Sequence, residues 1–238
     1  MASSKAKQKS APCRLIVVGG HTRSIGKTQL VCDLIAALPT ACWLAGKITQ
    51  FGHGVCAQNG QDCDCAPREH AAALDWELAG HPLSKDESDS ARFLQAGAEC
   101  AFWLRTKQGH LAEGMPLLRD ALATASARQR NSRNDALNVI IESNSLLQFV
   151  RPSLYITVFD ATRDDFKDSA RQMLDRADVF VFRRGLDEQD LTGPPRLPLP
   201  AQLLRERPSL LQREGQPLPL PLFQLVERIL DRPPAVTI

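Results

Sequence analysis

The feature that most constrains the fold is an apolar run followed at once by a glycine-rich turn. Residues 15–18 read LIVV, and GGHTRSIGKT follows over residues 19–28. A short, fully apolar run predicts a buried strand, and KTQLVCDLIAAL (27–38) has the apolar spacing of a helix. The sequence therefore predicts a strand, a tight turn and a helix, an arrangement that presents backbone N–H groups to an anion.

Further apolar runs alternate with helical segments along most of the chain. The pattern predicts helices at 27–38, 111–125 and 165–177, and strands at 14–20, 41–48, 100–106, 136–143, 153–160 and 179–183. Short apolar strands that alternate with helices indicate an α/β fold. We expect a doubly wound, mostly parallel sheet with helices on both faces.

The pattern divides the chain into three parts. We expect a disordered leader at 1–13, the α/β domain at 14–192 and a Pro- and Leu-rich C-terminal extension at 193–238. Within the extension, residues 222–230 could pack as a closing helix, whereas the prolines favour an extended path around the core. The interval 49–99 is too long for a simple turn, so it is expected to be an inserted functional region.

Composition narrows the class of protein. The 238 residues are 43% hydrophobic and 24% charged, and their net charge of +2 gives no reason to expect nucleic acid or a membrane surface as a partner. No apolar run approaches the roughly 20 residues that cross a bilayer, and the N-terminus lacks the apolar segment of a secretory signal. Seven cysteines are an odd number for a disulfide framework. These features favour a cytoplasmic protein, with Cys32 and Cys42 as small buried hydrophobes in a helix and a strand.

The glycine-rich turn holds the residue types that a phosphate-binding loop needs. Glycines let N–H groups point at phosphate oxygens, a lysine meets the charge, and a hydroxyl at the start of the helix binds Mg²⁺. Five residues separate the two glycines, one more than in the usual motif. The alternative is a glycine-rich turn without a ligand. We predict a magnesium-dependent nucleoside triphosphate site formed by Gly20, Ser24, Ile25, Gly26, Lys27, Thr28 and Gln29.

Three segments resemble known families. The loop GHTRSIGKT resembles the GTDTGVGKT loop of dethiobiotin synthetases, which encloses the same five positions. DSARFLQAGA (89–98) is similar to a D-S-x-R-x-x-x-A-G-A segment of the MobB family, the molybdopterin-guanine dinucleotide biosynthesis proteins B. VIIESNSLLQFVRPSLYITVFD (139–160) resembles that family's strand–E-G–loop–P–strand segment, with ESNS where the family has an EG pair.

The resemblance spans residues 14–183 and covers neither the cysteine-rich loop nor the extension. It implies a MobB-like P-loop NTPase that binds Mg²⁺ with GTP or ATP and supports the biosynthesis or assembly of a cofactor, as in molybdenum cofactor biosynthesis. A cofactor-biosynthesis enzyme would then be its partner. Proteins of this branch are often homodimers.

Polar residues at expected strand ends are further site candidates. Glu142 would lie beside the Mg²⁺, where it could hold the metal through a water or orient an attacking water; the alternative is a carboxylate bonded to nearby backbone. Asp160 could serve the metal or cap the next turn. Lys47 lies where ligands bind in such folds, and dethiobiotin synthetases carry a substrate-contacting lysine in a similar place; it could equally be solvated. Asp89 and Arg92 could contact the phosphates or pair with each other.

The base is not assigned by the sequence. The segment FRRGLDEQD (182–190) lacks the N-K-x-D tetrad by which GTPases recognise guanine. Arg183 and Arg184 could lie near the base or form a solvated strand end. The MobB resemblance favours GTP, and the dethiobiotin synthetase resemblance favours ATP.

A polar loop holds three closely spaced cysteines, Cys56, Cys63 and Cys65. His53, His70 or Cys100 could supply a fourth ligand for zinc or an iron–sulfur cluster. The spacing is not the paired C-x-x-C of common zinc sites, so reactive thiols and incidental cysteines stay open as alternatives.

Three functions fit these patterns. The first is a nucleoside triphosphatase that couples binding or hydrolysis to cofactor biosynthesis. The second is an ATP-dependent ligase or kinase that phosphorylates a carboxylate-like substrate near Lys47. The third is a nucleotide-gated adaptor with little turnover, which binds a partner enzyme through 49–99 and the extension.

Overall fold

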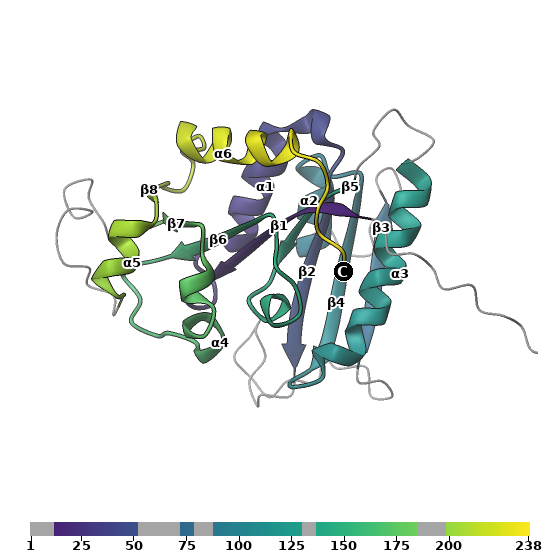
Figure 1. The fold of residues 1–238 in the computed structure, drawn as a ribbon, viewed down its shortest axis with the longest axis horizontal. Coiled ribbons are helices and arrows are strands. Elements are labelled where there is room, and N and C mark those ends of the chain that lie inside the picture. Colours follow the sequence, from purple (N-terminus) through teal and green to yellow (C-terminus); the bar gives the residue numbers. More distant parts are fainter. Residues whose placement is uncertain (1–11, 52–71, 79–87, 130–136, 185–198) are drawn as a thin grey trace, which may run out of the picture.

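The computed structural model describes residues 12–51, 72–78, 88–129, 137–184 and 199–238, and the fold is given for these ranges. Their strands form one eight-stranded sheet in the order β3-β4-β2-β5-β1-β6-β7-β8 (Figure 1). The strands are β1 (Cys13–Gly20), β2 (Leu44–Phe51), β3 (Ala72–Leu78), β4 (Cys100–Lys107), β5 (Leu137–Glu142), β6 (Leu154–Phe159), β7 (Val179–Phe182) and β8 (Ser209–Leu211). All pairings are parallel except that of β3 with β4. The predicted mostly parallel α/β sheet is confirmed.

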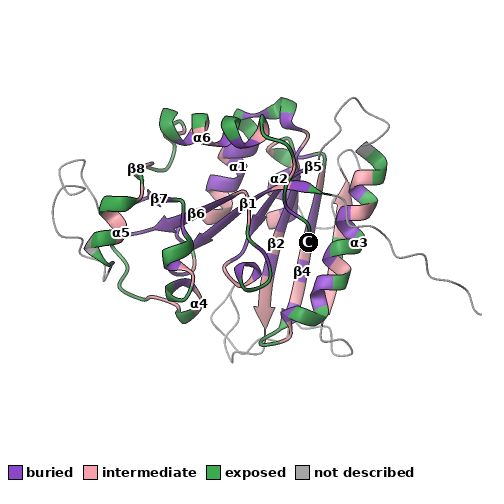
Figure 2. Ribbon diagram, viewed as in Figure 1, coloured by how far each residue is buried: buried purple, intermediate pink, exposed green. Residues whose placement is uncertain are grey.

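Helices cover both faces of the sheet. They are α1 (Lys27–Ala37), α2 (Asp89–Gln95), α3 (Leu111–Gln129), α4 (Asp168–Arg171), α5 (Ala201–Glu206) and α6 (Leu220–Leu230), with 3₁₀ turns η1 (Pro39–Ala41), η2 (Ser145–Gln148) and η3 (Leu174–Arg176). Alternate residues of β1 point to opposite faces. Ile16 and Val18 therefore pack with α1, α2 and α6, whereas Leu15 and Val17 pack in the cluster that contains α3. The central strands of the sheet are buried, and the outer surfaces of the helices are exposed (Figure 2).

The first two strands begin at different residues than predicted. Strand β1 starts at Cys13, which is fully buried, so this residue does not belong to the leader expected at 1–13. Strand β2 starts at Leu44 rather than at residue 41, because Pro39–Ala41 forms a 3₁₀ turn and Cys42 has a left-handed φ of 52°. Cys42 is therefore partly exposed and outside the strand, whereas Cys32 is buried in α1 as expected.

Two segments differ in type from the prediction. The described parts of 49–99 hold the antiparallel edge strand β3 and the short helix α2, neither of which was predicted. The helix expected at 165–177 is only the single turn α4 followed by η3. Lys167 is extended, and its N–H donates to the carbonyl of His21, so a helix cannot begin before Asp168; Met173, with φ −109° and ψ 3°, then interrupts it.

The C-terminal extension is packed against the sheet. Of the two alternatives left open for 222–230, the structure has the helix: α6 buries Leu222, Val226 and Ile229 at helical spacing. Strand β8 adds to the edge of the sheet beside β7, and Val236 pairs with Cys13 on β1. Among the described residues, no helix has both the length and the apolar character needed to cross a bilayer.

Candidate functional site

The turn between β1 and α1 has the backbone shape of an anion-binding loop. Ser24 and Gly26 have positive φ values of 52° and 86°, and Gly26 lies at the N-cap of α1. No side chain caps this helix, so its first N–H groups are not satisfied by a capping side chain. The partial positive charge of the helix N-terminus therefore faces the space above the loop.

Lys27 and Thr28 begin the helix at this point. The Nζ atom of Lys27 donates a hydrogen bond to the carbonyl of Thr22 at 2.6 Å, across the mouth of the loop. Burial lowers the pKa of Lys27. The Thr28 hydroxyl donates to Oε2 of Glu142 at 2.6 Å. The parallel register pairs Glu142 with Val18, which brings this acid from β5 to the same edge of the sheet as the loop.

Lys47 joins Glu142 to α2. Its Nζ atom lies 2.5 Å from Oδ2 of Asp89 and 3.3 Å from Oε1 of Glu142. Burial acts to lower the pKa of Lys47, but the negative charges of Glu142 and Asp89 and the hydrogen bonds to them outweigh it and raise the pKa. The ammonium is therefore held in its charged form between two acids. The pairing corrects the alternative of a freely solvated lysine.

Arg92 and Gln29 extend this network along α1. Arg92 donates from Nη2 to Oε1 of Gln29 at 2.8 Å, and its Nη1 atom lies 3.9 Å from Asp89. Gln29 in turn donates to Asp33 at 2.8 Å. The internal pair of Asp89 and Arg92 considered from the sequence is thus present, and both side chains also face the cavity described next.

One cavity of about 910 Å³ brings the predicted residues together. Gly20 lies behind it, where an added Cβ would meet the Lys27 side chain at 2.9 Å. Asp160 lines the cavity too, but its carboxylate accepts hydrogen bonds from the backbone and hydroxyl of Thr162, so it does cap the following turn. The remaining predicted lining residues are Ser24, Ile25, Gly26, Lys27, Thr28, Gln29, Lys47, Asp89, Arg92 and Glu142, together with Arg183 and Arg184, which were considered near the base.

Two residues of this region were missed. The Asn144 side chain accepts from the Gly20 N–H and donates to the Gly20 carbonyl, both at 2.9 Å, and so fixes the start of the loop to the end of β5. The sequence showed ESNS where the MobB family has an EG pair, but it did not show which residue the Asn144 side chain contacts. Lys167 lines the same cavity, and burial, followed by the charges of Lys27 and Arg23, lowers its pKa to about 8. No sequence signal indicated this lysine.

The predicted cysteine site lies outside the described residues. His53, Cys56, Cys63, Cys65 and His70 all fall in 52–71. Within the described ranges, no group of three or more His, Cys, Asp or Glu side chains is placed to hold a metal. Cys100 is half-buried at the start of β4, and burial raises the pKa of its thiol.

Zinc or an iron–sulfur cluster at Cys56, Cys63 and Cys65 therefore stays a prediction. A metal can supply the ordering free energy that a polar loop without apolar core lacks. We expect protein purified without a histidine tag to contain about one equivalent of zinc or one cluster. The double variant Cys63→Ser/Cys65→Ser should lose it, as measured by elemental analysis. Substoichiometric metal that is unaffected by this change would contradict the prediction.

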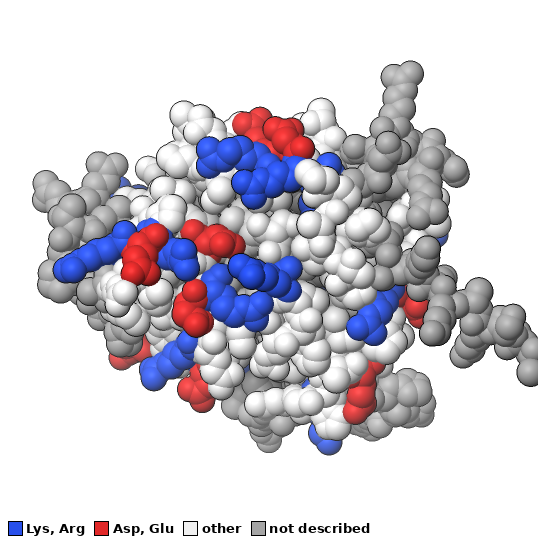
Figure 3. Space-filling model, viewed as in Figure 1, with Lys and Arg blue, Asp and Glu red and all other residues white. Residues whose placement is uncertain are grey.

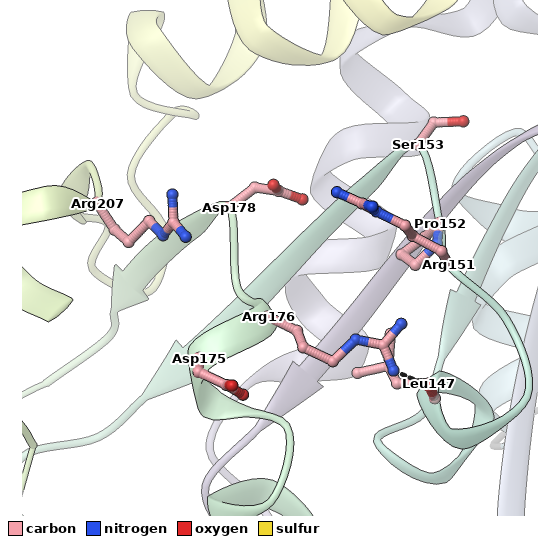
Figure 4. Close-up of a pocket in the computed structure, with 8 residues that line it drawn as sticks. All are labelled: Leu147, Arg151, Pro152, Ser153, Asp175, Arg176, Asp178 and Arg207. Carbon is pink, nitrogen blue, oxygen red and sulfur yellow. Dashed lines mark hydrogen bonds between the residues drawn. The ribbon is translucent and has the colours of Figure 1, made fainter.

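A second cavity, of about 590 Å³, opens at the amino-terminal ends of the strands, opposite the phosphate loop. Its lining comes from segments that precede β6, β7 and β8 and includes Arg151, Arg176 and Arg207 together with Asp175 and Asp178 (Figure 4). Basic and acidic side chains gather near the middle of the face seen in Figure 3. Asp178 accepts from the Tyr155 N–H at 2.7 Å and Arg176 donates to the Val150 carbonyl at 3.0 Å, so these two charged groups brace the backbone.

Comparisons with known proteins give only distant likenesses. No protein-family model matches the chain, and no curated protein matches it in sequence. Among solved structures, it is similar to the "apo" form of LpxK from Aquifex aeolicus in complex with ATP, at 12% identity and a TM-score of 0.44 over 84% of this chain. It is also similar to HypB from Helicobacter pylori in complex with nickel, at 15% identity and a TM-score of 0.38 over 92% of this chain. The match covers 53% of the LpxK chain and 85% of the HypB chain.

Proposed function

We propose that this chain is a P-loop protein that binds a magnesium nucleoside triphosphate in the 910 Å³ cavity and hydrolyses it. The observation that carries the proposal is the meeting of two features at one helix start. The loop N–H groups and Lys27 offer positive charge, and the hydroxyl of Thr28 lies 2.6 Å from the carboxylate of Glu142. A phosphate chain requires the first feature and a hard cation the second.

Lys27 would serve the phosphates directly. Its ammonium now donates to the Thr22 carbonyl, a neutral acceptor. A phosphate oxygen is a stronger acceptor because it carries charge, so the lysine would exchange one partner for the other when a triphosphate binds. Ser24 and Gly26, in the left-handed region, would turn the loop N–H groups toward the same oxygens.

The Thr28 hydroxyl and the Glu142 carboxylate fit Mg²⁺, because both are hard oxygen donors and they already lie within hydrogen-bond distance. When bound, Mg²⁺ neutralises charge that develops on the phosphate oxygens. Thr28 would hold the metal directly, and Glu142 would hold it through a water or orient the attacking water. Lys47, 3.3 Å from Glu142, keeps that carboxylate in place.

The MobB-like role is a finer part of the proposal. The D-S-x-R segment that suggested the MobB family places Asp89 and Arg92 on the cavity wall, which supports a shared use of these residues. A role in the biosynthesis or assembly of a cofactor, with a biosynthetic enzyme as partner, is proposed on that basis.

Calorimetry with ATP, GTP and their diphosphates, with and without Mg²⁺, tests the site. Binding of one triphosphate that strengthens with Mg²⁺ is the expected result, and no binding of any nucleotide would reject the proposal. Single-turnover hydrolysis then separates an enzyme from a nucleotide-gated adaptor.

The size of the cavity supports a second candidate, phosphoryl transfer to a bound acid. Beyond Lys47 the cavity continues along the ends of β2 and β4, where Trp103 donates to Thr49 at 2.9 Å and Arg105 stacks on the Trp103 ring at 4.8 Å. The Arg105 guanidinium also bonds to Asp75 at 2.6 Å. The wall would therefore present an aromatic ring and an already paired cation to a planar or anionic acceptor. Phosphate release that depends on an added small carboxylic acid would favour this ligase or kinase over a simple triphosphatase.

Lys167 gives the site a pH dependence. Its pKa of about 8 means that the ammonium loses its proton as the pH rises through 8, whereas a bound triphosphate stabilises the charged form. Affinity for the triphosphate should therefore be highest below pH 8 and fall above it, by up to about tenfold per pH unit. The measurement is the Kd from about pH 7 to about pH 9.

The matched variants for this test are Lys167→Met and Lys107→Met. Lys107 is exposed at the end of β4, so its replacement should leave the pH profile as in the wild type. Lys167→Met should bind more weakly below pH 8 and show a flatter profile. An unchanged slope in Lys167→Met would assign the titration to another group.

A further inference from the structure

Arg183 is a buried cation in contact with the phosphate loop. It follows β7 directly and is only 5% exposed, which corrects the alternative of a solvated strand end. A Cβ placed on Gly26 would lie 2.9 Å from Nε of Arg183, so the guanidinium packs against the turn that ends the loop. Its neighbour Arg184 is different, since its side chain is 63% exposed and pairs with Glu214 on the surface.

The C-terminal extension holds this guanidinium in place. Nη1 of Arg183 donates to Oε1 of Gln212 at 2.7 Å and lies 3.6 Å from Oδ2 of Asp33. Gln212 follows β8, is 1% exposed and donates from Nε2 to the same Asp33 oxygen at 3.0 Å. A buried charge is costly unless it is paired and hydrogen-bonded. Gln212 and Asp33 therefore determine where Arg183 can sit.

The same contacts continue into the first turn of α1. Asp33 accepts from Nε2 of Gln29 at 2.8 Å, and Gln29 is one of the residues that line the cavity. The helix that begins at the phosphate loop is thus tied through Asp33 to Gln212, while Arg183 presses on the glycine that precedes the helix. Both ties come from outside the strand–loop–helix motif itself.

We propose that Arg183 is a positioning residue for the phosphate loop and that the C-terminal extension, through Gln212, completes the nucleotide site. The inference rests on the proposed function. The Gly26 turn has a φ of 86°, and the N–H groups around it are useful only while that turn is fixed. Arg183 fixes the turn by contact, and its charge adds to the positive potential behind the loop.

The test uses two conservative variants of the full chain, each with a matched control. Arg183→Lys keeps the charge but removes the fork that contacts both Gln212 and Gly26, and its control is Arg205→Lys, an exposed arginine of α5 that does not line the cavity. Gln212→Met keeps the length but removes both hydrogen bonds. Its control is Gln202→Met on α5, where the native amide bonds to the exposed Glu206.

The readouts are the Kd for the magnesium triphosphate that the wild type binds and the melting temperature with and without it. Arg183→Lys and Gln212→Met should each bind about tenfold more weakly, and the nucleotide should raise their Tm less than that of the wild type. Both controls should stay within about twofold of the wild type. The double variant should bind the nucleotide no more weakly than the weaker-binding single variant, because both changes break the same hydrogen bond between Arg183 and Gln212.

The outcomes separate this inference from the proposed function. A wild type that binds no nucleotide rejects both. If the wild type binds nucleotide and the variants have a lower Tm but an unchanged Kd, measured well below that Tm, the two residues have only a structural role. This outcome overturns the inference but not the proposed function. Strictly additive losses in the double variant would also overturn it, because Arg183 and Gln212 would then act separately.

Discussion

Lys27→Ala is expected to weaken triphosphate binding by about ten- to a hundredfold while leaving the fold intact. The ammonium of Lys27 donates to the Thr22 carbonyl, and burial lowers its pKa, so an anion bound beside it would stabilise its charged form. Losing one charge-assisted contact costs roughly 1.5–3 kcal/mol, or a factor of about ten to a hundred in affinity. Calorimetry should show this loss as a rise of the Kd by the same factor.

The control for this change is Lys107→Ala, which removes an equal charge from an exposed position at the end of β4. Circular dichroism and the Tm without nucleotide should match the wild type in both variants. Affinity that is unchanged in Lys27→Ala would remove the phosphate loop from the proposed function, whatever the shape of the turn.

The central strands could be predicted because they are buried on both faces. Strands β1, β5, β6 and β7 are almost entirely apolar, since helices cover them on either side, and their sequences show it without reference to any partner. The glycines and the GKT that follow β1 likewise carry a local signal. The loop, its helix and the acid at the end of β5 were therefore all found from short stretches of sequence.

The edge elements could not be predicted in this way. Strand β3 is half-buried along its length and owes its conformation to its antiparallel partner β4, and β8 is only three residues long. The helical pattern at 165–177 was misleading, because a tertiary hydrogen bond from Lys167 to His21 overrides it. Local patterns do not encode these long-range pairings.

The residues of the site show the same difference between local sequence signals and long-range contacts. Residue types and spacing indicated Thr28 and Glu142 separately, but their 2.6 Å contact joins positions 114 residues apart. The hydrogen bond from Arg183 to Gln212 depends on where β8 adds to the sheet, and no sequence motif indicates that position. Sequence reasoning thus indicated the groups that are proposed to carry the chemistry, and it missed the long-range contacts between them and the rest of the fold.

Glu142→Gln is expected to lower turnover by at least about a hundredfold while changing triphosphate affinity only a few-fold. The amide keeps the size of the side chain and can still accept from Thr28 at 2.6 Å. It loses the negative charge that lies 3.3 Å from Lys47 and that would serve the metal or the attacking water. A group used mainly in the transition state affects kcat far more than binding, and general-base effects amount to about 10²–10⁴.

Asp160→Asn is the informative comparison, because Asp160 lines the same cavity but is bonded to the backbone and hydroxyl of Thr162. We expect a smaller loss of turnover there than in Glu142→Gln, measured by single-turnover hydrolysis at saturating nucleotide. If instead Glu142→Gln loses affinity, turnover and Tm together, Glu142 braces the end of β5 against Lys47 and Thr28. The catalytic acid would then have to be sought among the other carboxylates of the cavity, with Asp160 the first to test, since it too follows a central strand at this edge of the sheet.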